Sequence, residues 1–288
     1  MENLINAIVS GFISGSLYAI MALGLSILYG VSRVFNFGHG TVALLGAYIA
    51  WWMLTALSLP FAVAVFISSI ALYFFGLVMY RYAIKSLLQK PGWDISTVLF
   101  MLGAGILLEN IVLQIFGPRV KSTPVLFDGK VNAGFLEITN HELALIVIAI
   151  ASVIALNAFF KYSNLGQSMQ AVAQSIPGAR VVGIDIDYVY GLTFGLAFAV
   201  TGFSGILLGS KYFLNPHIGW EWMVKGFVIV TFGGLGSTTG AIYAAFILGI
   251  VEAVATLYFG AIWVWPLWFT MFLVVLLVRP RGILGGRS

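Results

Sequence analysis

The polar residues best suited to contact a solute stand between two long apolar runs. Asn36, His39 and Thr41 occur there together with Gly38 and Gly40. Glycine lets the backbone leave a helix, and the freed peptide groups, with Asn and His side chains, can contact a polar solute inside an apolar bundle. We therefore predict a substrate-contacting segment. The alternative is a tight turn between two helices in which the histidine is hydrogen-bonded internally.

Two glutamates stand inside apolar runs. Glu109, followed by Asn110, and Glu252 each precede a Phe-Gly pair by the same number of residues. At 1.5 Å per residue, each carboxyl group would lie about 10 Å before the end of its helix. A charge inside a membrane costs roughly 2.5 to 3.5 kcal/mol on insertion scales and normally faces a cavity or a partner. We predict that these residues line a polar pathway. The alternative is that each glutamate is protonated or hydrogen-bonded to a neighbouring helix and only braces the bundle.

Signatures of enzymes and metal sites do not occur in the sequence. Gly233, Gly234 and Gly236 look like a phosphate-binding loop, but no lysine follows them as that motif requires. The chain has no cysteine, no Gly-x-Ser-x-Gly elbow and no paired catalytic carboxylates within one segment. His141 and His217 have no second ligand residue nearby, so we expect no metal and no cofactor. The chain is therefore expected not to be an enzyme, and the glycines are better explained by close helix packing and a helix break.

Composition places these residues in a membrane protein. Of the 288 residues, 61% are apolar and only 8% are charged, and the mean hydropathy is +1.04. A soluble domain carries about 25% charged residues, so most of this surface must face a lipid bilayer. The formal net charge of +4 is explained by basic cytoplasmic loops and gives no reason to expect a nucleic-acid partner.

The apolar runs predict an all-α polytopic membrane protein with about eight to nine transmembrane segments. The runs cover residues 7–30, 38–57, 60–80, 96–116, 142–160, 188–212, 222–236, 238–259 and 261–278. A helix needs about 20 residues to cross a hydrocarbon core about 30 Å thick. The run 222–236 is short, which leaves two counts open. Either nine segments cross, or eight cross and one re-entrant or broken helix lies near 222–240.

Basic residues predict the orientation, because cytoplasmic loops carry an excess of Lys and Arg. If the loops 81–90 and 161–187 and the C-terminal arginines are cytoplasmic, nine crossings place the N-terminus outside. The loop 117–141 is then extracytoplasmic, although its basic residues do not follow the rule. The cytoplasmic loop 161–187 is polar and rich in small residues. It predicts a short helix up to Pro177, a turn and a second short element.

Several stretches resemble one protein family in the order in which they occur. They are SLYAIMALGLSILYGVSRVFNFGHGTVALLGAYIA, GARVVGIDID, YVYGLTFGLAFAVTGFSGIL, NPHIGW, FGGLGSTTGAIYAAFILGIVEAV and LLVRPRGILG. The chain closely resembles the first permease subunit of the ABC importers of branched-chain amino acids. The resemblance covers nearly the whole chain. It implies a single permease domain over residues 1–288, located in the plasma (inner) membrane, that imports branched-chain or other hydrophobic amino acids.

The resemblance also implies partners. They are a second homologous permease subunit, two cytoplasmic ATP-binding subunits that hydrolyse ATP, and an extracytoplasmic substrate-binding protein. The loop 161–187 resembles the coupling helix that such permeases dock into a groove of the ATPase. The residues carried over to this contact are Gln167, Gln170, Ala171, Ala173, Gly178, Arg180, Gly183 and Asp185. Relatives often have arginines in place of Gln167 and Gln170, which weakens the expectation of a salt bridge there.

A second departure from the family concerns the substrate. Relatives commonly have an acidic residue where this chain has Thr41. If that acid meets an ammonium group, its loss favours a different or less charged solute. The alternatives left open are an importer of urea, short amides or aromatic acids, and a proton-coupled secondary carrier. A passive channel is disfavoured because the loop 161–187 is longer than a channel needs.

Overall fold

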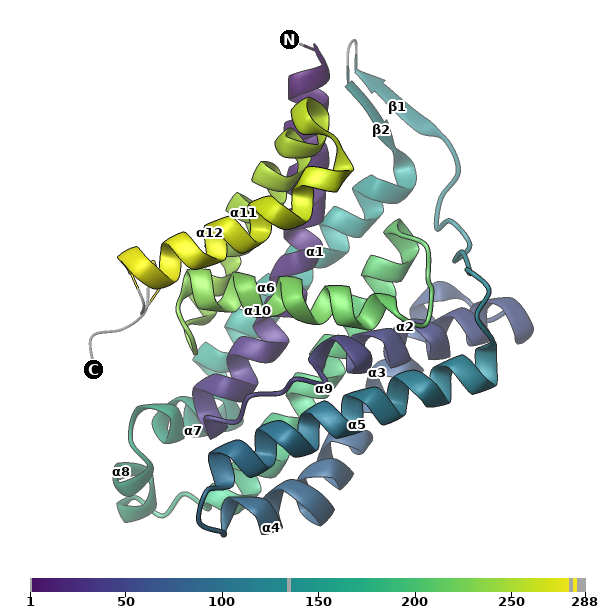
Figure 1. The fold of residues 1–288 in the computed structure, drawn as a ribbon. Coiled ribbons are helices and arrows are strands. Elements are labelled where there is room, and N and C mark those ends of the chain that lie inside the picture. Colours follow the sequence, from purple (N-terminus) through teal and green to yellow (C-terminus); the bar gives the residue numbers. More distant parts are fainter. Residues whose placement is uncertain (1, 134–135, 280–281, 284–288) are drawn as a thin grey trace.

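The computed structural model describes residues 2–133, 136–279 and 282–283. Helices make up nearly all of it, with one short antiparallel hairpin (Figure 1). The longer helices are α1 (Glu2–Ser32), α2 (His39–Ala56), α3 (Phe61–Met79), α5 (Trp93–Phe116), α6 (Asn140–Tyr162), α9 (Ile186–Lys211), α10 (Ile218–Gly233), α11 (Thr238–Phe259) and α12 (Val264–Val278). The predicted all-α polytopic membrane protein is confirmed.

Each of the nine predicted segments overlaps one of these helices. Among the described residues, seven helices are long and apolar enough to cross a membrane; the second of them continues from α3 through a π-helical turn, Tyr80–Ile84, into α4 (Lys85–Leu88). The other two segments form α2, with 18 residues, and α10, with 16 residues. At 1.5 Å per residue, α10 is about 24 Å long, less than a hydrocarbon core of about 30 Å. The number of full crossings therefore stays open between the two counts.

The loops gather at two opposite ends of the bundle. The N-terminus and the hairpin of β1 (Lys130–Ala133) and β2 (Leu136–Thr139) lie at one end in Figure 1. Helices α4, α7 (Asn164–Gln174) and α8 (Ile176–Val181) lie at the other. This separation agrees with alternating segments that place 117–141 and 161–187 on opposite sides. Which end is cytoplasmic stays a prediction, and Arg281 and Arg287, used to make it, lie outside the described residues.

The loop 117–141 is held to its end of the bundle. Lys121 and Leu214 exchange two backbone hydrogen bonds of 2.8 Å, which join this loop to the one before α10. The His141 Nε2 atom lies 2.9 Å from the carbonyl oxygen of Ser210. Thr139 and Glu142 form a capping box at the start of α6. The hairpin in this loop was not predicted from the sequence.

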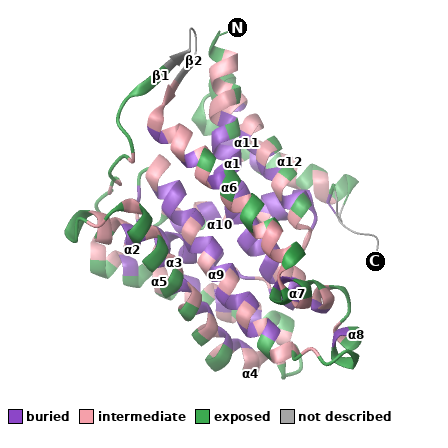
Figure 2. Ribbon diagram, turned by 180° about the vertical axis from the view of Figure 1, so that it is seen from behind, coloured by how far each residue is buried: buried purple, intermediate pink, exposed green. Residues whose placement is uncertain are grey.

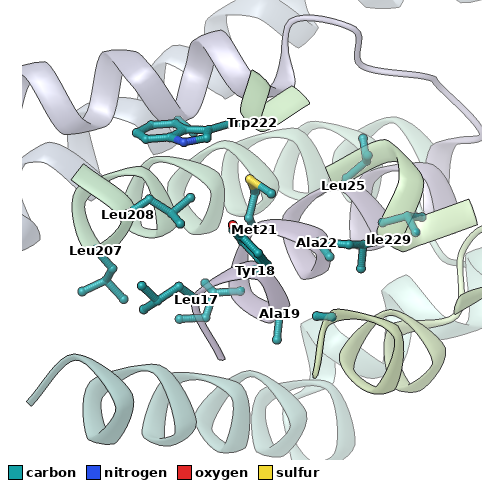
Figure 3. Packing of buried hydrophobic residues seen from close by; sticks show 14 of the residues in the cluster. Leu17, Tyr18, Ala19, Met21, Ala22, Leu25, Leu207, Leu208, Trp222 and Ile229 are labelled. Carbon is teal, nitrogen blue, oxygen red and sulfur yellow. The ribbon is translucent and has the colours of Figure 1, made fainter. Parts of the chain in front are cut away.

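Helices α1 and α9 form the centre of the molecule. In each, 78% of the most apolar window is buried, compared with 11 to 28% in the other helices that could span a membrane. Figure 2 shows buried residues on these central helices and exposed residues on the outer ones. Leu17, Tyr18 and Met21 of α1 pack against Leu207 and Leu208 of α9, as Figure 3 shows. The outer helices are left to face lipid or partner subunits.

Small residues bring the central backbones together. A Cβ atom on Gly11 of α1 would lie 2.6 Å from the Cα atom of Ile250 on α11, and one on Gly249 would lie 2.7 Å from the Cα atom of Gly15. Real Cβ atoms do not approach other atoms this closely, so only glycine permits the contact. These glycines therefore allow the close packing of α1 against α11.

A glycine-rich break separates α10 from α11. Gly234 and Gly236 have φ values of 109° and 82°, which L-residues rarely adopt. The Ser237 side chain then accepts a hydrogen bond of 3.1 Å from the backbone N–H of Gly240 and caps α11. The predicted helix break is confirmed.

Candidate functional site

The polar segment around His39 lies inside the molecule. After α1 ends at Ser32, residues 33–38 run back into the bundle, and α2 begins there rather than at the end of the bundle (Figure 1). The Asn36 Oδ1 atom accepts a hydrogen bond of 3.0 Å from the backbone N–H of Gly38, which turns the chain into α2. Asn36, His39 and Thr41 are all buried, with at most 5% of their surface exposed.

His39 links three helices. Its Nε2 atom donates to the carbonyl oxygen of Met21 on α1 at 2.9 Å, and its Nδ1 atom lies 3.2 Å from the Thr201 hydroxyl on α9. Both ring nitrogens therefore have partners within the protein. This geometry fits the alternative of an internally bonded histidine, and contact between His39 and a solute stays a prediction.

We expect His39→Leu to lower the free energy of unfolding by about 1 to 3 kcal/mol, because it leaves the buried Met21 carbonyl oxygen without its donor. Thermal unfolding of the detergent-purified protein, followed by tryptophan fluorescence, measures the change. Asn110→Leu is the control, since the Asn110 side chain is exposed and bonds only to Ile106 of its own helix. Equal melting temperatures for the two variants would contradict the linking role of His39.

The start of α2 is packed between α5 and α10. A Cβ atom on Gly105 of α5 would lie 3.1 Å from the Cα atom of Gly38 and 3.4 Å from the Thr41 hydroxyl oxygen. A Cβ atom on Gly219 of α10 would lie 3.2 Å from the Cα atom of Thr41. The backbones of three helices thus meet at Gly38 to Thr41.

A hydrogen-bond partner of Glu109 lies beside this meeting point. Glu109 follows Gly105 by one helical turn, and His217 directly precedes α10. The Glu109 Oε1 atom and the His217 Nδ1 atom are 2.6 Å apart, and 69% of the His217 side chain is exposed. The structure thus brings Glu109 close to the α2 start, as a shared pathway requires. Sequence reasoning placed His217 only at a loop edge.

Asn110 takes no part in this hydrogen bond. Its side chain is exposed, and its Nδ2 atom donates to the Ile106 carbonyl oxygen of the same helix at 2.8 Å. Polar side chains in a membrane-spanning helix normally face a cavity or a protein partner rather than lipid. Asn110 therefore marks a face of α5 suited to contact with another subunit.

Glu252 belongs to a different cluster, formed by α1, α10 and α11. Its Oε1 atom lies 2.8 Å from the Nζ atom of Lys225, which also donates to the Tyr18 hydroxyl at 3.0 Å. Lys225 is buried and lies within 6 Å of the rings of Tyr18, Trp265 and Trp268. This arrangement fits the bracing role of Glu252 better than the pathway role, which stays a prediction.

Sequence reasoning missed Lys225, although a signal was present. A lysine inside a mostly apolar segment needs a partner, and Glu221 stands four residues before it. In the structure, the Lys225 Nζ atom lies 3.3 Å from the Glu221 Oε1 atom as well as 2.8 Å from Glu252. Lys225 and Glu252 carry opposite charges in separate apolar segments, so the sequence alone could have suggested that they form an ion pair.

The loop 161–187 forms a short helix and a second short element, as predicted, but the first helix ends at Gln174 and Pro177 lies in the second. Ser163 caps α7 and Ser175 caps α8, and the second cap accepts from the backbone N–H of Gly178 at 3.1 Å. Pro177 stands in the first turn of α8, where its missing N–H costs nothing. Asp185 caps α9 by accepting from the backbone N–H groups of Asp187 and Tyr188.

Among the other residues that the family resemblance assigns to the ATPase contact, some determine the path of the loop and others are exposed on its surface. Gly183 has a φ of 84° and ends the loop after α8. Ala171 and Ala173 are half-buried. Gln167 and Gln170 are exposed, and their amides donate to carbonyl oxygens at the end of α6. The outward-facing surface consists of these glutamines, the exposed Arg180, and two valines that sequence reasoning missed, Val181 and Val182.

Comparison with known proteins decides the family. The model of the family described as branched-chain amino acid transport system, permease component, matches residues 7–279. The chain belongs to this permease family. It is thus a transport subunit and a multi-pass protein of the inner membrane.

Relatives of known name support this placement in the permease family. The LivH permease protein of Escherichia coli K12 is 31% identical over 96% of this chain and 94% of its own length. The BraD permease protein of Pseudomonas aeruginosa is 29% identical over the same shares of each chain. The probable LivH permease of Methanocaldococcus jannaschii is 26% identical over 95% of this chain and 90% of its own. The similarity therefore includes both the α1–α2 segment and the α7–α8 loop.

Proposed function

We propose that residues 1–288 form the single permease domain of an ATP-driven ABC importer that takes up branched-chain or other hydrophobic amino acids. The observation that carries this proposal is the match to a branched-chain amino acid permease family over residues 7–279. The relatives with the highest identity above are named for high-affinity transport of the same substrates. Import then alternates between outward-facing and inward-facing states of a permease pair.

ATP-binding subunits supply the energy in this proposal, because the sequence contains no phosphate-binding loop of its own. The α7–α8 loop supports docking of these subunits. Val181 is 88% exposed and Val182 is 74% exposed, beside the exposed Arg180. Adjacent exposed apolar residues rimmed by polar ones are typical of protein-binding surfaces.

A second, homologous permease subunit covers the face formed by α5, the 33–38 segment and α10. Polar groups at Glu109, Asn110 and His217 stand on this face, where contact with lipid would be costly. The half-buried rings of Phe35 and Phe37 each lie within 6.0 Å of the Phe227 ring. An apolar amino acid passing between the two permeases would meet these aromatic rings and the Glu109–His217 pair.

The extracytoplasmic substrate-binding protein docks at the opposite end from α7 and α8. The loop 117–141 presents the exposed apolar side chains of Val120, Val125 and Phe127 there. This loop is fixed through Lys121 and His141, so it can receive a partner with little ordering cost.

Copurification tests the assembly. The tagged chain is expressed with its candidate partners, and the complex isolated in mild detergent is analysed by native mass spectrometry. We expect a complex of this chain with one further permease and two ATP-binding subunits. A stable species that contains this chain without any ATP-binding subunit, when all partners are present, would contradict the proposal.

We expect Glu109→Leu to lower ATP-dependent uptake about tenfold or more, because the variant loses the hydrogen bond between Glu109 and His217 at the pathway. Glu109→Gln should retain most of the uptake, since its amide can still bond to His217. Initial rates of radiolabelled leucine uptake in proteoliposomes measure both effects. Complete loss of uptake in both variants would instead favour a proton-coupled carrier, in which the titrating carboxyl group itself is required.

A further inference from the structure

A cavity of about 470 Å³ opens at the α7 end of the bundle, outside the pathway described above. It lies between α1, the end of α6, α7 and the start of α11. Its volume is within the range of about 300 to 1,000 Å³ that is typical of small-ligand sites. It does not involve Thr41, Glu109 or His217, so it is separate from the pathway residues described above.

The polar part of this cavity favours an anion. Lys161 lines it, and none of its described lining residues is acidic. Thr238 and Thr239 also line it and form the first turn of α11, where backbone N–H groups lack partners within the helix. The positive end of the helix dipole adds to the charge of Lys161. The side-chain amides of Asn157 and Gln174 can donate further hydrogen bonds.

A buried hydroxyl group in the cavity wall lacks a partner. Ser26 of α1 lines the cavity, has no exposed surface, and its Oγ atom makes no hydrogen bond among the described residues. A buried hydroxyl without a partner costs roughly 1 to 3 kcal/mol on mutational scales, and the cost is removed when a ligand supplies an acceptor. This observation is independent of the helix start and also indicates a ligand with an acceptor oxygen.

The remaining walls are apolar. Ile27 and Val31 of α1 face Phe160 of α6 and Met169 of α7 around the cavity. Lys161 lies at the end of α6, where the membrane interface is expected, and its Nζ atom sits 5.1 Å from the centre of the Tyr162 ring. Apolar walls beside a basic group at a membrane edge suit a phosphate group that carries apolar chains.

We propose that this cavity is a binding site for a phosphate group, held by Lys161, the start of α11 and the Ser26 hydroxyl. Either an anionic phospholipid headgroup or free inorganic phosphate can supply this group. Because α7 forms one wall, an occupant also ties α7 to α1 and α6. An effect of the occupant on ATPase coupling rests on the proposed function, whereas binding itself does not.

Native mass spectrometry of the detergent-purified complex tests the site. We expect one dioleoyl phosphatidylglycerol molecule to bind, with an affinity about tenfold lower in Lys161→Gln, because a charged hydrogen bond is lost. Ser26→Val should also weaken binding, since it fills the buried wall without changing charge. Lys90→Gln is the matched control, because Lys90 is exposed outside this cavity, and it should bind like the unchanged protein.

Further measurements distinguish a phospholipid headgroup from free inorganic phosphate as the bound group. Displacement of phosphatidylglycerol by millimolar inorganic phosphate would support a site for the free ion, and retention of the lipid would support a headgroup site. Equal binding of phosphatidylcholine would overturn the proposal, because it shows no preference for an anion. Equal losses in Lys161→Gln and Lys90→Gln, or no loss in Ser26→Val, would also overturn it.

Discussion

Replacing Lys225 by methionine is expected to lower the free energy of unfolding by about 3 to 5 kcal/mol, because it leaves a mostly buried carboxylate without its cation. The Glu252 Oε1 atom lies 2.8 Å from the Lys225 Nζ atom, and the Glu252 Oε2 atom is already buried without a partner among the described residues. Methionine keeps the length and apolar contacts of the lysine side chain. Unfolding of the purified protein in detergent, followed by tryptophan fluorescence, measures the loss.

The double variant Lys225→Met/Glu252→Gln provides the control for this prediction. Removing both charges should restore most of the stability, since the main cost in the single variant is the unpaired charge. A double variant as unstable as the sum of the two single variants would show that the charges do not act as a pair. Transport by the stable double variant also separates the two roles of Glu252. Retained uptake supports the brace, and lost uptake supports the pathway.

The variant Val181→Asp/Val182→Asp is expected to abolish ATP-dependent uptake, with a loss of about a hundredfold or more. Two carboxylates would stand at the centre of the proposed contact with an ATP-binding subunit, where unpaired desolvated charges cost several kcal/mol. Both valines are exposed, so the fold of the permease should be unchanged. Copurification of the ATP-binding subunits and uptake of leucine measure the effect.

Matched valines at the opposite end give the control. Val120 and Val125 are also exposed, at 60% and 59%, and lie in the loop 117–141. Val120→Asp/Val125→Asp should leave the ATP-binding subunits attached. If the Val181→Asp/Val182→Asp complex stays intact and active, the α7–α8 loop is not the docking surface. Arg180 and the neighbouring glutamines would then need another function.

Local sequence patterns predicted where the helices lie, because the free energy of transferring an apolar run into lipid depends on the residues of that run alone. The helix break at Gly234 was also predicted, since glycine adopts φ values that other residues avoid. The helix predicted up to Pro177 instead ends at Gln174, because proline also fits the first turn of a second helix. Hydropathy could not show that α1 and α9 are central. All the long runs are apolar, whether they face lipid or other helices.

The site was predicted only in part for a similar reason. The Asn36 to Thr41 segment was found because its polar residues and glycines are adjacent in sequence. His217, the partner of Glu109, lies far from it in the sequence, and Lys225, the partner of Glu252, lies in a separate helix. Both pairs therefore form only through tertiary packing. The same Phe-Gly pattern follows both glutamates, and both helices end at that phenylalanine, yet their surroundings differ.

Uptake of leucine into proteoliposomes tests the central claim most directly. The full complex, with ATP-binding subunits facing the ATP and with the substrate-binding protein added, should accumulate leucine, isoleucine or valine only while ATP is hydrolysed. Vesicles that contain this chain alone should accumulate none. Failure of the complete, ATP-hydrolysing complex to take up any of these amino acids would contradict the proposed substrate. Uptake by this chain alone, without ATP, would contradict the proposed importer.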